Sequence, residues 1–355
     1  MNKLLKIQTK ILAITIILLI SIPGMLLAQK IAIIDAGSSG SRLYVYEIKN
    51  DGRRIDILYP AVGQEANSKG RALSSVSDHN DSVKVFLTTM TSKYNQSSAT
   101  GKIPLYILAT AGMRIKDKKE ADSIYAKISR IASKEKLNGF HLEKAMTISG
   151  RYEGFYAWIA ANYKNGKLGF NNSSPEKPLT YTGEPYGILE IGGASMQIAF
   201  AANKADTNFI SRKGFGYIYS ISYLGGGVDQ IFQKYKDTKT PTFGIGLKKI
   251  SDLSINTSHF IGLGKPIEIV LDGVKSKGIP IKDYPKSLTI KQEDDSQKNF
   301  HPWINAHYIS YVVDSLKLDG KLNKPKIKSD WTEGAALDII INREEPEKFD
   351  YNKRN

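Results

Sequence analysis

Two stretches of the chain share one design: Lys30-Ile-Ala-Ile-Ile-Asp35-Ala-Gly37-Ser-Ser-Gly-Ser-Arg42-Leu-Tyr-Val-Tyr46 and Tyr186-Gly-Ile-Leu-Glu190-Ile-Gly192-Gly-Ala-Ser195-Met-Gln197-Ile-Ala-Phe200. Each reads as an apolar strand, a carboxylate near its end, a glycine two residues later, a run of small residues and a second strand. One such stretch alone fits an ordinary tight turn as well as it fits a binding hairpin. Two copies predict a duplicated α/β domain with both hairpin tips facing a shared cleft.

The hairpin tips have the composition of an anion site. Glycine and serine let backbone N–H groups and hydroxyls approach an anion closely, and successive N–H groups form a nest for phosphate. The acids at the strand ends, Asp35 and Glu190, can hold a hard divalent cation directly or through water. The pattern therefore predicts phosphate and a divalent cation between the hairpins.

The overall composition is that of an ordinary globular protein. The 355 residues are 41% hydrophobic and 24% charged, which excludes a disordered, collagen-like or small disulfide-rich chain. This length predicts about two domains, each large enough for its own core. The formal net charge of +15 favours anionic partners, but no nucleic-acid-binding motif is present, so nucleic acid is not expected as a partner.

The first 28 residues have the layout of a signal peptide. Three lysines precede the apolar run 11–22, and Pro23, Gly24 and Ala28 follow it. The run is short for a membrane span. We expect cleavage after Ala28, export to the periplasm or the medium, and no stable membrane span afterwards, with an uncleaved N-terminal anchor as the alternative.

Several kinds of site are excluded by residue types that are missing. The sequence has no cysteine, and its five histidines include no HExxH pair or other close metal spacing. An exported chain without cysteine has no disulfide, no structural Cys-zinc site and no thiol nucleophile. The pattern Gly-x-x-x-x-Gly-Lys-[Ser/Thr] is also missing, which excludes a P-loop nucleotidase.

Two further segments carry polar groups at suitable places. The apolar strand 103–108 runs into a small-residue turn, where Thr110 can donate to a phosphate oxygen or hold a water. Arg114 can pair with an anion or an acid, although a structural salt bridge is the simpler role. In the helical segment 148–163, Glu153 lies off the apolar face, where it is either a general base or a solvated glutamate.

The second half of the chain is less informative. Residues 223–229 form a glycine-rich turn, and residues 234–295 are lysine-rich with short apolar runs that suggest no chemistry. Residues 330–340 predict a helix with a small-residue patch for close packing. The polar tail from Asn342 to Asn355 is expected to be solvated.

With these segments in view, the chain resembles the GDA1/CD39 family of nucleoside triphosphate diphosphohydrolases, the apyrases. The family's five motif regions have counterparts here in the same order, at residues 35–42, 109–114, 150–163, 190–197 and 331–335. The resemblance implies the fold of actin, hexokinase and Hsp70, in which two RNase H-like α/β domains flank a nucleotide cleft. It implies a first domain of residues 29–147 plus 315–355 and a second of residues 148–314.

The resemblance also implies roles for the matching residues. Glu153 would be the catalytic base, and Ser195 and Gln197 would position the attacking water. Asp35 and Glu190 would hold Mg²⁺ or Ca²⁺ through its water shell. The residues expected to bind phosphate and nucleotide are Gly37, Ser38, Ser39, Gly40, Ser41, Arg42, Thr110, Gly192, Gly193 and Ala194.

Two positions depart from the family pattern. The family has aspartate where this chain has Glu190 and threonine where it has Met196. The extra methylene of Glu190 moves the carboxylate and therefore bears on metal distance and activity. The first motif region, with Gly-Ser-Arg after the serines, is more similar to the soluble and Golgi diphosphatase branch than to the cell-surface branch. The sequence therefore does not decide whether nucleoside diphosphates or triphosphates are the preferred substrates.

The implied reaction is metal-dependent in-line attack of water on the terminal phosphorus of a nucleoside tri- or diphosphate, with Glu153 taking the proton. One rival, an exopolyphosphatase or guanosine pentaphosphate phosphatase, shares the superfamily, but the helix 152–163 and the export signal favour an apyrase. Another rival is a nucleotide-binding surface protein with weak turnover, which Glu190 supports. Trp303 and Tyr311 are candidates for stacking on the base, and a monomer is the default.

Overall fold

The computed structural model describes residues 29–49, 54–61, 63–94, 101–171, 179–203, 208–238, 243, 247, 257–288 and 297–353. The predicted signal peptide, residues 1–28, lies outside this part of the chain. None of the helices in the described ranges is both long enough and apolar enough to span a bilayer.

The first sheet is built around the first predicted hairpin. Its strands are β1 (Gln29–Gly37), β2 (Gly40–Ile48), β3 (Ile55–Tyr59), β4 (Lys69–Gly70), β5 (Ile103–Ala109) and β6 (Phe140–Thr147). Their order is β3-β2-β1-β5-β6, with β4 beside β2. β2 is antiparallel to β1, whereas β5 is parallel to it. The tip of the hairpin therefore lies beside the carboxyl end of β5.

The second sheet repeats this arrangement. Its strands are β9 (Gly187–Ile191), β10 (Ser195–Ala202), β11 (Phe209–Arg212), β12 (Gly216–Leu224), β13 (Phe260–Leu263) and β14 (Leu322–Asn323). β9 and β10 form the hairpin, and β13 is parallel to β9 as β5 is to β1. A separate pair consists of β7 (Leu168–Phe170) and β8 (Leu179–Tyr181). The duplicated architecture predicted from the two sequence stretches is confirmed.

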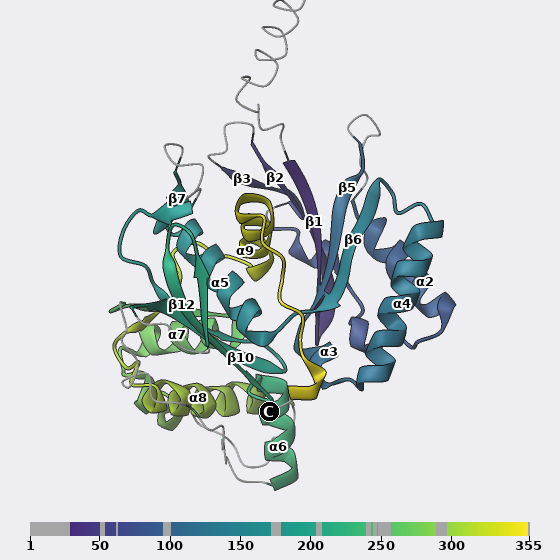
Figure 1. Cartoon of the computed structure of the whole chain (residues 1–355). Helices are drawn as coiled ribbons and strands as arrows, with labels where there is room; N and C mark the ends of the chain where they lie inside the picture. Colours follow the sequence, from purple (N-terminus) through teal and green to yellow (C-terminus); the bar gives the residue numbers. More distant parts are fainter. Residues whose placement is uncertain are drawn as a thin grey trace, which may run out of the picture.

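Helices cover the outer faces of both sheets, and two helices lie between them. The outer helices and the short one at the cleft are α2 (Asn80–Thr91), α3 (Ala111–Ile115), α4 (Lys118–Lys134), α6 (Val228–Thr238), α7 (Lys265–Lys277) and α8 (Gln297–Ser315). The inner pair is α5 (Gly150–Lys164) and α9 (Trp331–Leu337), which lie side by side between the sheets (Figure 1).

Short helical turns complete the described structure. They are η1 (Glu65–Ser68), η2 (Leu73–Ser75), η4 (Ile281–Asp283), η5 (Pro285–Ser287), the π-helical turn η6 (Asp338–Asn342) and η7 (Tyr351–Lys353). The turn η6 continues α9 directly, so the chain leaves the space between the sheets through it.

The helix α5 is enclosed on both sides. It packs against β10 and β12 on one side and against α9 on the other. Glycines make this contact close: a Cβ atom at Gly334 would overlap the carbonyl oxygen of Tyr156, and one at Gly154 would lie 2.8 Å from Ser220 Oγ. The face that carries Glu153 is therefore buried as well as the apolar face, because the second sheet and α9 enclose the helix from two sides.

The second sheet extends further along the chain than the predicted boundary at residue 315. Leu316, Leu318 and Leu322 pack in the second core, and β14 pairs with β13. These residues thus belong with the second half of the molecule, and the chain returns to the first sheet only after Asn323.

The expectation of a solvated C-terminal tail holds only in part for residues 343–353, which we call the C-terminal strap. Most of its described polar side chains are exposed, but Pro346 and Tyr351 are buried. Phe349 and Tyr351 pack against the first core, and Lys348 forms a β-bridge with Ile148. In Figure 1 this yellow segment runs from α9 towards α3. The tail is polar on average, but its two aromatic side chains find apolar surface beside β6 and hold it there.

Candidate active site

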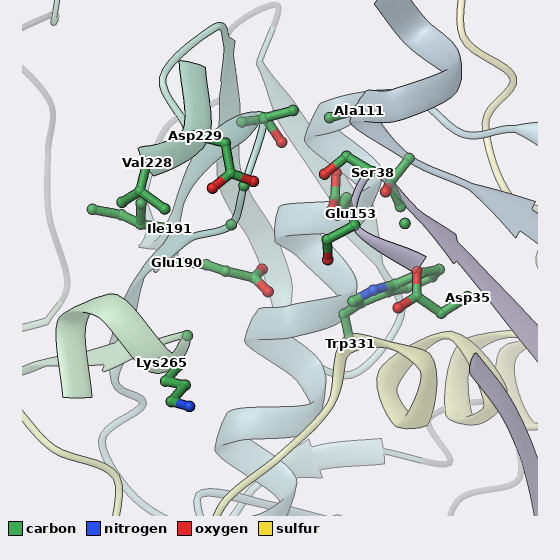
Figure 2. Close-up of a pocket in the computed structure, with 18 of the residues that line it drawn as sticks. Asp35, Ser38, Ala111, Glu153, Glu190, Ile191, Val228, Asp229, Lys265 and Trp331 are labelled. Carbon is green, nitrogen blue, oxygen red and sulfur yellow. The ribbon is translucent and has the colours of Figure 1, made fainter. Parts of the chain in front are cut away.

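A cavity of about 420 Å³ lies between the two hairpin tips. The predicted site residues that line it are Asp35, Gly37, Ser38, Ser39, Arg42, Thr110, Glu153, Glu190, Gly192, Gly193, Ala194 and Ser195. In Figure 2, Asp35 and Glu190 project into the cavity from opposite sides, and Glu153 on α5 lies between them. The fold therefore brings both hairpins and three of the other predicted segments to one place.

Three of the predicted residues do not line the cavity. Gly40 and Ser41 already belong to β2, because the first hairpin turns over only two residues, Ser38 and Ser39. Ser41 pairs with Gly70 of β4, and its hydroxyl is buried without a hydrogen-bond partner in the structure. Gln197 lies behind the lining and acts on Glu153, as described below. Because residues 37–41 are all glycine or serine, the sequence does not indicate where strand pairing resumes after the turn.

The two hairpin tips approach each other closely. A Cβ atom at Gly193 of the second tip would lie 3.1 Å from Ser38 Oγ of the first. A Cβ atom at Gly112, at the start of α3, would lie 2.9 Å from Ser38 Cα. A side chain at Gly112 would thus collide with the backbone of Ser38, whereas one at Gly193 would displace the side chains of Asp229 and Ser38.

Five carboxylates line this cavity: Asp35, Glu153, Glu190, Asp229 and Asp330. Burial raises the pKa of Asp35 well above its usual value, and the charge of Asp330 raises it further, while Arg42 opposes this shift from 3.7 Å. Burial likewise raises the pKa of Glu190, followed by the charges of Glu153, Asp330 and Asp35. Arg42 and Arg114 therefore compensate only part of the effect of burial and of the neighbouring acids.

The donor set fits a divalent cation. Glu190 Oε2 is buried and has no hydrogen-bond partner in the described structure, and carboxylate oxygens are the ligands that hard cations prefer. Across the described ranges, no group of three acidic or histidine side chains is close enough to hold one ion by direct ligation. A cation placed between Asp35 and Glu190 would therefore keep part of its water shell.

Glu153 is fixed by two neighbours. Arg114 forms an ion pair with its carboxylate, and Gln197 Nε2 donates a hydrogen bond to Glu153 Oε2 at 3.0 Å. Arg114 is 1% exposed, and its Nε donates to the carbonyl oxygen of Ile148 at 3.1 Å. Gln197 Nε2 also lies 2.7 Å from Ser195 Oγ. With an exposed fraction of 8%, Glu153 is not the solvated helix glutamate that the sequence left open.

This geometry agrees with a comparison to known protein families. Residues 29–242 match the model of the GDA1/CD39 (nucleoside phosphatase) family. The chain belongs to this family. It is 34% identical over 219 residues to ectonucleoside triphosphate diphosphohydrolase 1 of Bos taurus, which covers 56% of this chain and 41% of that protein. It is 31% identical over 219 residues to probable apyrase 4 of Arabidopsis thaliana, covering 58% of this chain and 40% of that protein.

The chain thus spans less than half the length of these two GDA1/CD39 relatives. Among solved structures, the Aquifex aeolicus member of the Ppx/GppA protein family superposes with a TM-score of 0.50 at 14% identity, over 90% of this chain and 100% of that one. At this identity the likeness concerns the fold alone. The fold is of the actin, hexokinase and Hsp70 type, with two RNase H-like halves around a cleft, as the family resemblance implied.

Several lining residues of this GDA1/CD39 member were not predicted. Asp330 caps α9, since its Oδ1 accepts from Thr332 N at 2.9 Å, and its Oδ2 accepts from Tyr44 at 2.9 Å. Asp229 and Lys265 line the cavity at the starts of α6 and α7. An acid directly before a helix is a recognisable cap in sequence, but its position beside Asp35 depends on where α9 docks.

The two candidates for base stacking lie elsewhere. Trp303 packs against His307, with ring centroids 4.2 Å apart, and Tyr311 packs against Phe243 at 5.5 Å. Both belong to α8 and the second core, and neither lines the cavity. Helical spacing put these rings on the face that packs into the protein.

Proposed function

We propose that this protein hydrolyses the terminal phosphate of nucleoside tri- or diphosphates with the help of a divalent cation. Membership of a nucleoside phosphatase family supports the reaction class. One observation carries the proposal for this chain: Glu153, oriented by Arg114 and Gln197, lies at the cavity between two glycine-rich tips. A buried, oriented carboxylate beside a phosphate site is the arrangement that activation of water requires.

The proposed cation is Mg²⁺ or Ca²⁺, held by Asp35 and Glu190 with water completing its shell. When bound, such an ion neutralises charge that develops on the phosphate oxygens. The raised pKa values of Asp35 and Glu190 and the unpartnered Glu190 Oε2 support this site. The charge of Asp330 raises the pKa of Asp35, which shows that the two acids interact. Asp330 would therefore add to the negative potential that attracts the cation.

The chain's own residues would perform the remaining steps. Backbone N–H groups of the two tips and the hydroxyls of Ser38, Ser39 and Thr110 would hold the phosphate chain. Ser195 would orient a water for in-line attack on the terminal phosphorus, and Gln197 would act indirectly through its hydrogen bonds to Ser195 and Glu153. As the new P–O bond forms and the bond to the leaving phosphate oxygen breaks, Glu153 would take the proton of that water.

We also propose that the protein acts after export, in the periplasm or outside the cell. The layout of residues 1–28 supports this, and so does similarity to a relative named as an ectonucleoside enzyme. A monomer and a nucleotide partner are the simplest assumptions. The division into domains would follow the two sheets, with the second ending after Asn323.

A second candidate is an enzyme that acts on a phosphate chain without a base. Trp331 is the single aromatic residue of the lining in the described part of the chain, and its ring already stacks on Tyr156, with centroids 6.4 Å apart. The described lining therefore offers little aromatic surface on which a purine base could stack. Inorganic polyphosphate would need only the tips, the cation and the basic side chains Arg42 and Lys265.

One experiment separates these functions. Phosphate release by residues 29–355 would be measured with ATP, ADP, GTP, GDP, UDP, AMP and polyphosphate, with Mg²⁺, with Ca²⁺ and with EDTA. Metal-dependent release from nucleoside tri- or diphosphates but not from AMP supports the proposal. Release from polyphosphate alone supports the second candidate, and nucleotide binding without release would make the protein a nucleotide-binding protein.

A further inference from the structure

The C-terminal strap is attached to the segment where α5 begins. The backbone N–H of Phe349 donates to the carbonyl oxygen of Thr147 at 2.8 Å, and Ser149 N donates to the carbonyl oxygen of Glu347 at 2.9 Å. Ser149 is the N-cap of α5, and its carbonyl oxygen accepts from Glu153 N at 3.2 Å. The strap thus holds the residue from which the helix carrying Glu153 starts.

A side-chain contact strengthens this attachment. Arg151, in the first turn of α5, donates through Nε to Glu347 Oε1 at 2.8 Å and forms a second contact through Nη2. Paired contacts between a guanidinium and a carboxylate restrict orientation as well as distance. The strap therefore holds the start of α5 through both backbone and side-chain contacts.

The strap also reaches the segment that carries Arg114. Tyr351 is 9% exposed, and its hydroxyl donates to the carbonyl oxygen of Met113 at 2.9 Å. The same hydroxyl lies 2.9 Å from Thr147 Oγ1, which lies 2.7 Å from the hydroxyl of Tyr125. Donation from Tyr125 to Thr147, then to Tyr351 and then to Met113 satisfies every hydroxyl in this chain of bonds.

These contacts have one feature in common. Arg114 follows Met113 in α3, and Glu153 follows Ser149 in α5, so the two partners of the buried ion pair come from separate segments. The helix α3 has only five residues and needs outside contacts to keep its orientation. The strap contacts both segments at once, at the residues next to the ion pair.

We propose that the C-terminal strap positions the catalytic base, with Tyr351 and Glu347 as its positioning residues. Neither residue lines the cavity, so each acts through the segments that bear Arg114 and Glu153. The inference rests on the proposed function, because it concerns the base of that reaction. A displacement of about 1 Å in a reacting group can lower a rate about 100-fold, so a loosened strap should lower turnover while leaving the substrate site intact.

The test uses Tyr351→Phe in residues 29–355, because phenylalanine keeps the ring in the core and removes the hydroxyl. We expect kcat for the best nucleotide to fall roughly 3- to 10-fold, a fraction of what a full 1 Å displacement would cause. KM should change by less than about 2-fold, since the phosphate-binding tips are untouched. The loss of the two hydrogen bonds of this hydroxyl, about 1–2 kcal/mol in total, should lower Tm by ~2–8 °C.

Glu345→Gln is the matched control. Glu345 lies in the same strap and pairs with Lys144 on β6, away from both α3 and α5, so its variant should match the parent in kcat, KM and Tm. If Tyr351→Phe does not fold, Glu347→Gln carries the same expected split between kcat and KM. A kcat equal to that of the parent, or an equal loss in the Glu345→Gln control, would overturn the inference.

Amide hydrogen exchange gives a readout that does not depend on turnover. Tyr351→Phe should speed exchange in residues 111–115 and 149–153 and leave the tips of both hairpins unchanged. If the parent releases no phosphate from any substrate while this exchange response occurs, the proposed function fails and the positioning contact stands. If the parent is active and neither kcat nor exchange responds, the inference itself fails.

Discussion

The two hairpins at the cavity have the same layout but different charge balance. In the first, Asp35 pairs across the strands with Arg42, whose guanidinium lies 3.7 Å from the carboxylate. In the second, Glu190 lies opposite Gln197, and its Oε2 has no hydrogen-bond partner in the described structure. The two hairpins thus share a backbone layout and an acid, but within the described residues an ion pair is found for Asp35 and not for Glu190. We therefore expect the second acid to depend more strongly on the proposed cation.

The largest expected effect comes from Glu153, which lies between the hairpins and belongs to neither. Glu153→Gln should lower kcat by about 10²–10⁴-fold, because the amide cannot take the proton of the attacking water. Metal and nucleotide binding should persist, since Asp35, Glu190 and both tips are unchanged. Phosphate release and equilibrium binding of nucleotide with metal provide the measurement. Near-parental turnover would remove Glu153 from the mechanism.

Neutralising each hairpin acid in turn tests the comparison directly. Glu190→Gln and Asp35→Asn should each weaken metal binding on the order of 10–100-fold. In EDTA at pH 8, Glu190→Gln should raise Tm, because it removes a buried acid that folding forces either to keep its proton or to carry a charge without a hydrogen-bond partner in the described structure. Asp35→Asn should raise Tm less, since it leaves Arg42 without its carboxylate. Thermal melting of both variants measures this difference, and equal Tm shifts would show that the hairpins are not distinct.

The raised pKa values of Asp35 and Glu190 predict how the stabilisation of the fold by a divalent cation depends on pH. In the metal-free protein, Asp35 and Glu190 hold protons more tightly when folded than when unfolded. Their contribution to stability is therefore greatest below about pH 4, near the unfolded carboxyl pKa values, and is lost as pH rises through the raised folded values. A divalent cation competes with these protons, so Mg²⁺ or Ca²⁺ should raise Tm more at pH 8 than at pH 5. A larger effect at pH 5 would contradict the site.

Making the second hairpin more like the first gives a smaller effect. Glu190→Asp removes one methylene and restores the acid that the family pattern has at this position. We expect turnover equal to that of the parent or a few-fold higher, measured at saturating metal. Met196→Thr, the other departure from the pattern, serves as the control, since Met196 is fully buried in the second core. A collapse of turnover in Glu190→Asp would mean that the site is built around the longer side chain.

The smallest effect is expected at Ser41, which the sequence placed among the phosphate-binding residues. Its hydroxyl is buried in β2 and has no hydrogen-bond partner among the described residues, so Ser41→Ala should leave turnover within about 2-fold and change stability by no more than about 1 kcal/mol in the stabilising direction. Ser38→Ala at the tip is the matched comparison and should raise KM. A loss of turnover in Ser41→Ala similar to that in Ser38→Ala would place Ser41 at the phosphate.

The sequence by itself determined the two hairpins, because the alternation of apolar residues and the placement of glycine and serine are local properties. It also singled out Asp35, Glu190 and Glu153, since acids at the end of a strand or within an apolar helix stand out against their neighbours. The family match covers residues 29–242, which include both hairpins and Glu153.

The tertiary structure decided which polar groups share the enclosed space. Asp330 is distant in sequence from Asp35 and joins it only because α9 docks between the sheets. The strap was expected to be solvated because its average composition is polar, yet Tyr351 is buried beside Met113. The physical reason is that a strand or turn follows from neighbouring residues, whereas a charge shift or an ion pair such as that of Arg114 and Glu153 depends on long-range packing and the water it excludes.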